Sequence, residues 1–103
     1  MQISFGENLR DEKNSEDKSY YYALVDEYLS SGQTGRALIQ AAKNIAYHED
    51  DPVAYRNRAR VYEKLGALEN AILDLKEALR LSPDDENTRL YLESIRKRIA
   101  VKN

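Results

Sequence analysis

The sequence predicts an all-α chain in which two helical hairpins are followed by one further helix. Small, aromatic and aliphatic residues recur three or four positions apart in several windows, the spacing of helices that bury one face. Glycines and a proline interrupt these windows where helices should end. The pattern also recurs after 34 residues, with Tyr21, Tyr28, Gly32 and Ala37 aligned with Tyr55, Tyr62, Gly66 and Ala71.

The 103 residues allow one domain, and their composition excludes several functional classes. The net charge of −2 provides no positive field for nucleic acid. There is no cysteine for a disulfide or a thiolate metal site, and no apolar run reaches the length of about 20 residues that spans a membrane. We therefore expect a cytoplasmic protein without nucleic acid or membrane partners and without a cofactor.

Residues 1–16 have no helical stripe, and their second half is almost wholly charged or amide. We expect a disordered lead-in there, with Phe5 as an isolated apolar residue.

The first hairpin is predicted over residues 18–51. Its helices should run over about 17–31 and 35–47, with Thr34 as the N-cap of the second. Asn44 stands where the second hairpin has Ala78, so it should be a weak point in the packing.

The second hairpin is predicted over residues 52–85. Asp51 and Pro52 supply an N-cap acid and a proline at the first helical position. Gly66 supplies the left-handed residue that ends the first helix. A last helix over 86–101, capped by Asp84 and Asp85, should cover the exposed core of this hairpin, with 102–103 as a tail.

Residues 52–85 closely resemble the tetratricopeptide repeat family, whose period is 34 residues. The positions that carry the resemblance are Tyr55, Ala59, Tyr62, Ala71, Leu75 and Pro83. The resemblance implies a non-enzymatic adaptor that binds a protein partner in a groove lined by the first helix of each hairpin. The period also implies a repeat at 18–51.

No constellation in the sequence predicts catalysis or metal binding. His48 is the single histidine, so no Ser-His-Asp or Cys-His arrangement can form. The run from His48 to Asp51 lacks the spacing that turns metal ligands toward one point and is interpreted as a solvated turn. We expect no enzyme and no metal site.

The predicted binding surface is the arc of each first helix that faces away from its packing stripe. Arg56 and Arg60 should grip an acidic side chain of the partner, and Tyr22, Leu29 and Val53 should take an apolar one. Alternatively, both arginines pair with acids of this chain. The complete predicted site is Tyr22, Asp26, Leu29, Val53, Arg56, Asn57, Arg60 and Glu63.

Two other functions stay open from the sequence. The domain could be a structural or self-associating unit, since fewer than three repeats leave unpartnered edges. The second repeat also resembles the middle repeat of co-chaperones that clamp acidic chaperone tails, with Asn57 at the position of the clamp asparagine. The other clamp positions hold Tyr22, Asp26, Asn87 and Tyr91.

One pair of positions predicts a specific contact between helices. The first hairpin has Leu24 and Gln40 where the second has Arg58 and Asp74, so an opposite-charge pair has replaced an apolar and amide pair. We predict a partly buried salt bridge that removes Arg58 from the binding arc.

Overall fold

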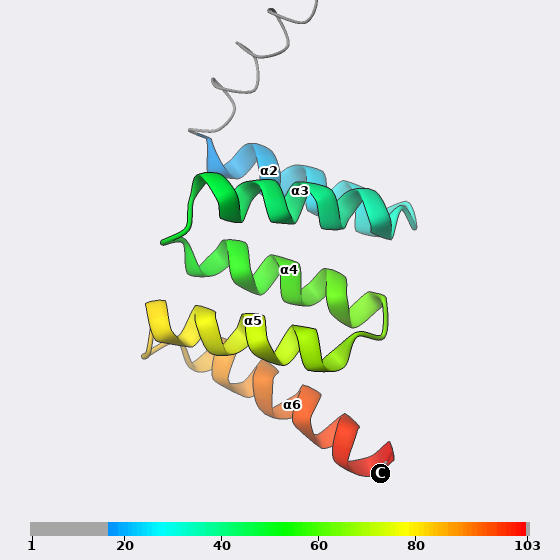
Figure 1. The fold of residues 1–103 in the computed structure, drawn as a ribbon, viewed down its shortest axis with the longest axis vertical. Coiled ribbons are helices and arrows are strands. Elements are labelled where there is room, and N and C mark those ends of the chain that lie inside the picture. Colours follow the sequence, from blue (N-terminus) through cyan, green and yellow to red (C-terminus); the bar gives the residue numbers. More distant parts are fainter. Residues whose placement is uncertain (1–16, 103) are drawn as a thin grey trace, which may run out of the picture.

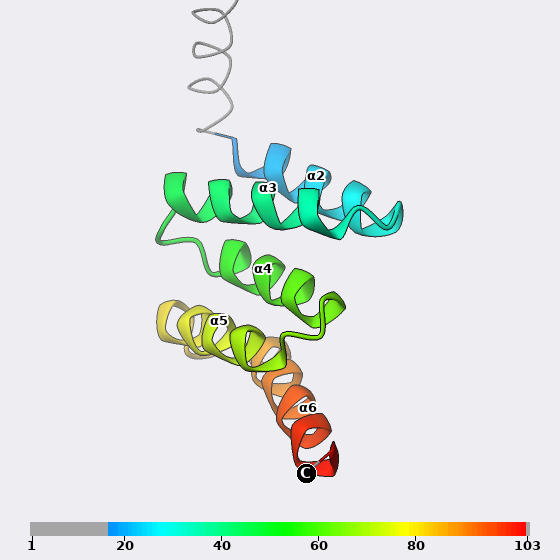
Figure 2. The same ribbon diagram turned by 45° about the vertical axis from the view of Figure 1, so that its right-hand side comes forward.

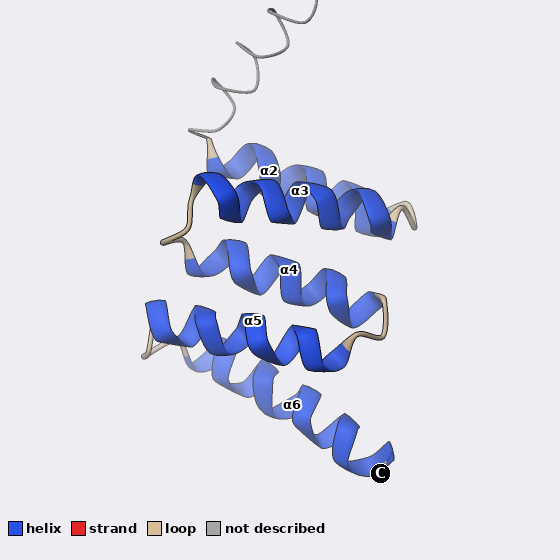
Figure 3. Ribbon diagram, viewed as in Figure 1, coloured by secondary structure: helices blue, strands red, loops and turns tan. Residues whose placement is uncertain are grey.

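The computed structural model describes residues 17–102, and this part contains five helices and no strand (Figures 1 and 3). The helices are α2 (Lys18–Ser30), α3 (Thr34–Tyr47), α4 (Pro52–Lys64), α5 (Leu68–Leu81) and α6 (Glu86–Lys102). The predicted all-α helical repeat with a C-terminal helix is therefore confirmed. The expected lead-in, with Phe5, lies outside the described residues.

The helices form a stack of antiparallel hairpins whose connections alternate between the two ends of the molecule (Figure 1). The turns within the hairpins, α2–α3 and α4–α5, lie at one end, and the α3–α4 and α5–α6 connections lie at the other. In the view turned by 45°, α6 diverges from α5 and points away from the stack (Figure 2).

Glycines in the left-handed region form both turns within the hairpins. Gly32 has φ 78° and Gly66 has φ 79°. Residues with a Cβ adopt such values only with steric strain. The prediction for Gly66 is confirmed, and its counterpart one repeat earlier plays the same part.

An aspartate caps the first helix of each unit, at positions 34 residues apart. Asp17 and Asp51 accept hydrogen bonds from the backbone N–H of the residue two positions on, at 3.0 and 3.1 Å. Asp85 accepts from the backbone and hydroxyl of Thr88. These bonds satisfy donors that a helix N-terminus leaves free.

The prediction for the start of α3 was wrong. Thr34 is the first helical residue, and Gln33 precedes it as the N-cap without a side-chain hydrogen bond. The backbone N–H of Ala37 donates to the carbonyl of Gln33. The helix therefore begins without the side-chain cap that was predicted from the Thr34 hydroxyl.

Two clusters of buried side chains form the core. One joins α4, α5 and α6 through Ala59, Ala71, Leu75, Leu92 and Ile95, so α6 covers the second hairpin as predicted. The other joins α2 and α3 to the far side of α4 through Val25, Ala37, Ala41 and Val61. Small residues at 37, 41, 59 and 71 let the helices approach closely.

Arg58 and Asp74 form the predicted bridge between α4 and α5. The Nε and Nη2 atoms of Arg58 donate to the two carboxylate oxygens of Asp74 at 2.8 and 2.9 Å. The side chains are 26% and 7% exposed, so the pair is partly buried. Arg58 also lies over the ring of Tyr62 at 5.7 Å and takes no part in the predicted binding arc.

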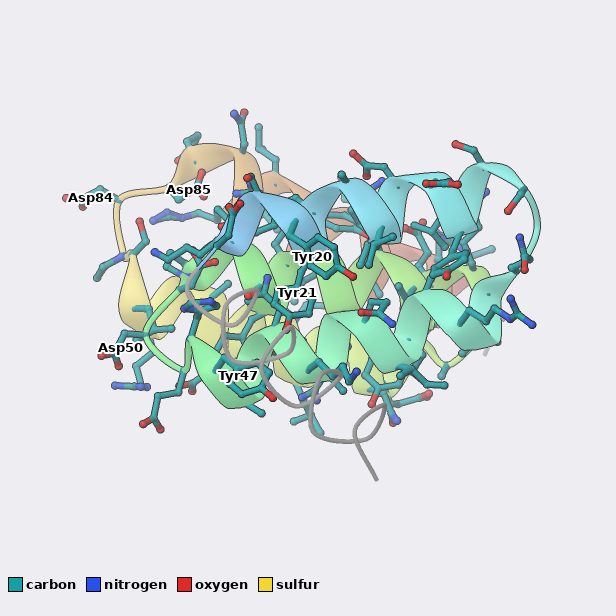
Figure 4. All side chains as sticks on the ribbon, turned by 90° about the horizontal axis from the view of Figure 1, so that it is seen from above. Tyr20, Tyr21, Tyr47, Asp50, Asp84 and Asp85 are labelled. Atoms are coloured by element: carbon teal, nitrogen blue, oxygen red, sulfur yellow. The ribbon has the colours of Figure 1, made fainter. Side chains whose placement is uncertain are left out.

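Two side chains of the first hairpin differ in burial. Asn44 is 1% exposed, and its Oδ1 has no hydrogen-bond partner among the described residues, in keeping with a weak point. Tyr47 is 47% exposed, and its ring stacks on that of Tyr21 at a centroid distance of 6.1 Å. With Tyr20, these rings lie together at the N-terminal edge of the stack (Figure 4).

Candidate functional site

Four residues of the predicted site, Asp26, Arg56, Arg60 and Glu63, make contacts between α2, α4 and the start or body of α6, and we call the face that these helices form the inner face. Side-chain contacts join these three helices across it. Between α2 and α4 the face contains a pocket of about 550 Å³, which we call the groove pocket. It is lined by Asp26, Leu29, Ser30, Arg60, Glu63 and Lys64.

Arg60 is the central cation of the groove pocket. Its Nη1 lies 2.9 Å from Oδ1 of Asp26 on α2 and donates to Oδ1 of Asn57 on its own helix at 3.0 Å. The side chains of Arg60 and Asp26 are 40% and 63% exposed. This ion pair is therefore accessible to a ligand and screened by water and salt.

Arg56 has a different environment, at the start of α6. Its Nη1 donates to Oδ2 of Asp85 at 2.9 Å and to Oγ1 of Thr88 at 3.2 Å. Thr88 is buried and also donates to Asp85, and this bond is the main cause that holds the pKa of the Asp85 carboxyl below its usual value. Arg56 therefore connects α4 to the N-terminus of α6.

Tyr22 makes the equivalent contact in the first hairpin. Its hydroxyl donates to Oδ2 of Asp51, the N-cap of α4. Arg56 and Asp85, which stand one repeat later than Tyr22 and Asp51, make the corresponding contact. Burial, and then the bond to Asp51, raise the pKa of Tyr22 above its ordinary value. The side chains at 22 and 56 thus tie each first helix to the start of the next.

Glu63 connects the other end of α4 to α6. One of its carboxylate oxygens accepts from the hydroxyl of Tyr91 at 2.5 Å, and the other from Arg98. Burial and this carboxylate raise the pKa of Tyr91. Glu63 therefore lies at the border of the groove pocket with its charge already paired.

The remaining predicted residues differ in accessibility. Leu29 and Val53 are half-buried. Asn57 is only 7% exposed and lies beneath Arg60, so its amide is not presented to a ligand as expected. Arg56 and Arg60 each pair with an acid of this chain, which is the contact that the alternative prediction gave.

Sequence reasoning missed two residues of the groove pocket. Ser30 is the last residue of α2, and Lys64 is the last residue of α4, one helical turn beyond Arg60. The signal for Lys64 was present, since residues four apart lie on one face of a helix.

The described residues contain neither a cluster of metal ligands nor a membrane-spanning helix. Within 17–102, no group of three or more His, Asp or Glu side chains is arranged to hold a metal ion. In the same part of the chain, none of the helices combines the length and apolar content needed to cross a bilayer.

Comparison with known proteins supports the interpretation of the fold. The sequence model of the tetratricopeptide repeat matches residues 52–85. The chain is also 30% identical over 78 residues to outer envelope protein 61 of Arabidopsis thaliana, an alignment that covers 76% of this chain and 14% of that protein. Residues 52–85, which contain α4 and α5, therefore match a tetratricopeptide repeat, and the helices of the described residues are compatible with a helical repeat of this kind.

Proposed function

We propose that this domain is a protein-interaction module that binds an extended peptide or a partner helix on the inner face, centred on the groove pocket. The observation that carries the proposal is the convergence of Arg60, Lys64 and Leu29 on one accessible pocket between α2 and α4. Tetratricopeptide repeats act as binding modules, which agrees with this use of the face.

The chemistry of the pocket favours a ligand with one acidic and one apolar side chain. Arg60 carries five N–H donors in a planar fork, and within the described residues only its Nη1 is engaged. Its Nε and Nη2 edge can bind a carboxylate with two parallel bonds, and Lys64 adds a second positive charge. Leu29 supplies apolar surface beside them.

This proposal moves the predicted acid-binding pair by one turn of α4. The sequence favoured Arg56 with Arg60, but Arg56 already holds Asp85 and the buried Thr88. Reversing its charge should therefore weaken the attachment of α6 and lower the melting temperature. Arg60 and Lys64 are the pair that a ligand can reach without disturbing the core.

Peptide display on the intact domain, followed by affinity measurements on purified variants, tests the proposal. Peptides enriched on the wild type should carry an acid next to an apolar residue. They should bind at least about tenfold more weakly to the double variant Arg60→Gln and Lys64→Gln, since each charged contact contributes about 1 kcal/mol or more.

The matched control is Lys76→Gln with Arg80→Gln, which removes the same charge from exposed positions of α5. Equal loss of affinity in the two double variants, or none in the groove variant, would contradict binding in the pocket.

A self-associating role has support from a different surface. Ile39 and Leu73 occupy equivalent positions of α3 and α5 and are 56% and 65% exposed. If they mediate association, sedimentation at two protein concentrations should show a dimer that Ile39→Ser with Leu73→Ser abolishes. Cytoplasmic location and binding of acidic chaperone tails stay predictions, the latter with Asn57 as its one matching residue.

A further inference from the structure

Two arginines of α4 hold acids of this chain in contrasting ways. Arg58 binds Asp74 through two nitrogens and two oxygens, and the carboxylate is 7% exposed. Arg60 meets Asp26 through one nitrogen, and that carboxylate is 63% exposed. The first geometry is a structural bridge between packed helices, and the second leaves the guanidinium fork open.

The Asp26 carboxylate occupies the position that an acidic ligand would approach. It lines the groove pocket beside Arg60 and projects from α2, the opposite wall from α4. A ligand carboxylate that takes the open fork must either displace Asp26 from Nη1 or remain close to its negative charge. An exposed pair of this kind contributes little to stability, so displacement costs little.

We infer that Asp26 is a competing carboxylate that sets the specificity of the groove pocket, an inference that rests on the proposed function. It lowers the affinity for every acidic ligand and most strongly for runs of acids, because the Asp26 carboxylate repels each added negative charge. The pocket therefore selects peptides with a single acid next to an apolar residue. Asp26→Asn keeps the shape of the side chain and removes this selection.

Nuclear magnetic resonance titrations with short probe peptides test the inference. The probes are acetyl-Leu-Glu-Leu-amide, its Leu-Gln-Leu counterpart and acetyl-Glu-Glu-Glu-amide, and the readout is the Arg60 Nε–H signal together with the backbone amides of α2 and α4. Asp26→Asn should bind Leu-Glu-Leu about twofold to fivefold more tightly than the wild type at low salt. Its gain for the triple-Glu probe should be larger, and Leu-Gln-Leu should show none.

Glu27→Gln is the matched control, because Glu27 is the exposed neighbour of Asp26 on α2 and loses the same charge outside the pocket. It should leave all affinities unchanged. Equal gains for both variants would assign the effect to net charge and overturn the inference.

The remaining outcomes separate this inference from the proposed function. If Leu-Glu-Leu shifts Arg60 and binds the wild type and Asp26→Asn equally, the competing role is wrong and the proposed function stands. If Leu-Glu-Leu shifts the Arg60 Nε–H signal in neither protein, the groove pocket is not an acid-binding site. Both the competing role of Asp26 and the proposed function are then wrong.

Discussion

Replacing Arg58 by leucine should destabilise the protein far more than replacing its partner Asp74 by glutamine. The reason is the difference in burial, since Asp74 is 7% exposed and Arg58 is 26% exposed. Without the guanidinium, an ionised carboxylate stays in the core, and the cost is about 3 kcal/mol. Without the carboxylate, the guanidinium can turn toward water while it stays over the Tyr62 ring. The glutamine can also still accept one hydrogen bond, so the loss of stability is about 1 kcal/mol.

The double variant Arg58→Leu with Asp74→Gln should be more stable than Arg58→Leu alone. It reproduces the pair that the first hairpin has at these positions, Leu24 and Gln40. We expect a total loss of about 1–2 kcal/mol and hence a coupling free energy of about 2–3 kcal/mol between the two sites.

Urea unfolding of the four proteins of this cycle, followed by circular dichroism at 222 nm, measures the coupling. The control is Arg80→Leu with Glu77→Gln, a pair one helical turn apart on the exposed side of α5, where the coupling should be below about 0.5 kcal/mol. A coupling below this value for Arg58 and Asp74, or a greater loss in Asp74→Gln than in Arg58→Leu, would refute the reasoning.

Three further substitutions test the packing and the caps. Ala71→Leu should lower the free energy of unfolding by about 1–3 kcal/mol in urea melts, because Ala71 is fully buried where α4, α5 and α6 meet. The control Asn70→Leu, at an exposed position, should change it little. Equal effects of the two substitutions would contradict the helix pairing. Asn44→Ala should raise stability by about 0.5–1 kcal/mol because it removes a buried carbonyl without a partner, and a loss above about 1 kcal/mol in the same melts would count against this. Thr88→Val should raise the pKa of Asp85, since that carboxyl is held below its usual value mainly by the Thr88 hydroxyl. Because the pKa of Asp85 is lower in the folded state, this carboxylate stabilises the protein above the unfolded pKa, and the stabilisation is lost as pH falls through the folded pKa. The variant should therefore lose less stability on acidification. An unchanged titration of the Asp85 carboxyl by NMR would contradict the assignment.

Features with a local physical cause were predictable from the sequence. The helices follow from side-chain periodicity, and their ends follow from Asp51, Pro52 and Gly66, whose effects act within a few residues. The Arg58–Asp74 bridge was predictable for another reason. The internal repeat offers a second copy of each position, and a change at both members of a pair indicates contact.

Features that depend on distances between separate elements were not predictable in the same way. The side of α4 that bears Arg56 and Arg60 follows from the helical period, but the acid that each one meets depends on how α2 and α6 are placed. Arg56 reaches Asp85 because α6 begins beside it, a contact across 29 residues. The start of α3 at Thr34 depends on backbone geometry that a hydroxyl side chain alone does not determine.

Mapping the binding site of a display-selected peptide on the folded domain tests the central claim most directly. The measurement is a titration of the ¹⁵N-labelled protein, with chemical shifts followed for the backbone amides and the arginine Nε–H groups. We predict that the largest changes fall on Leu29, Ser30, Arg60 and Lys64, and that the α3 and α5 amides at Ile39 and Leu73 do not shift. Changes concentrated at Ile39 and Leu73, with Arg60 unaffected, would contradict binding on the inner face.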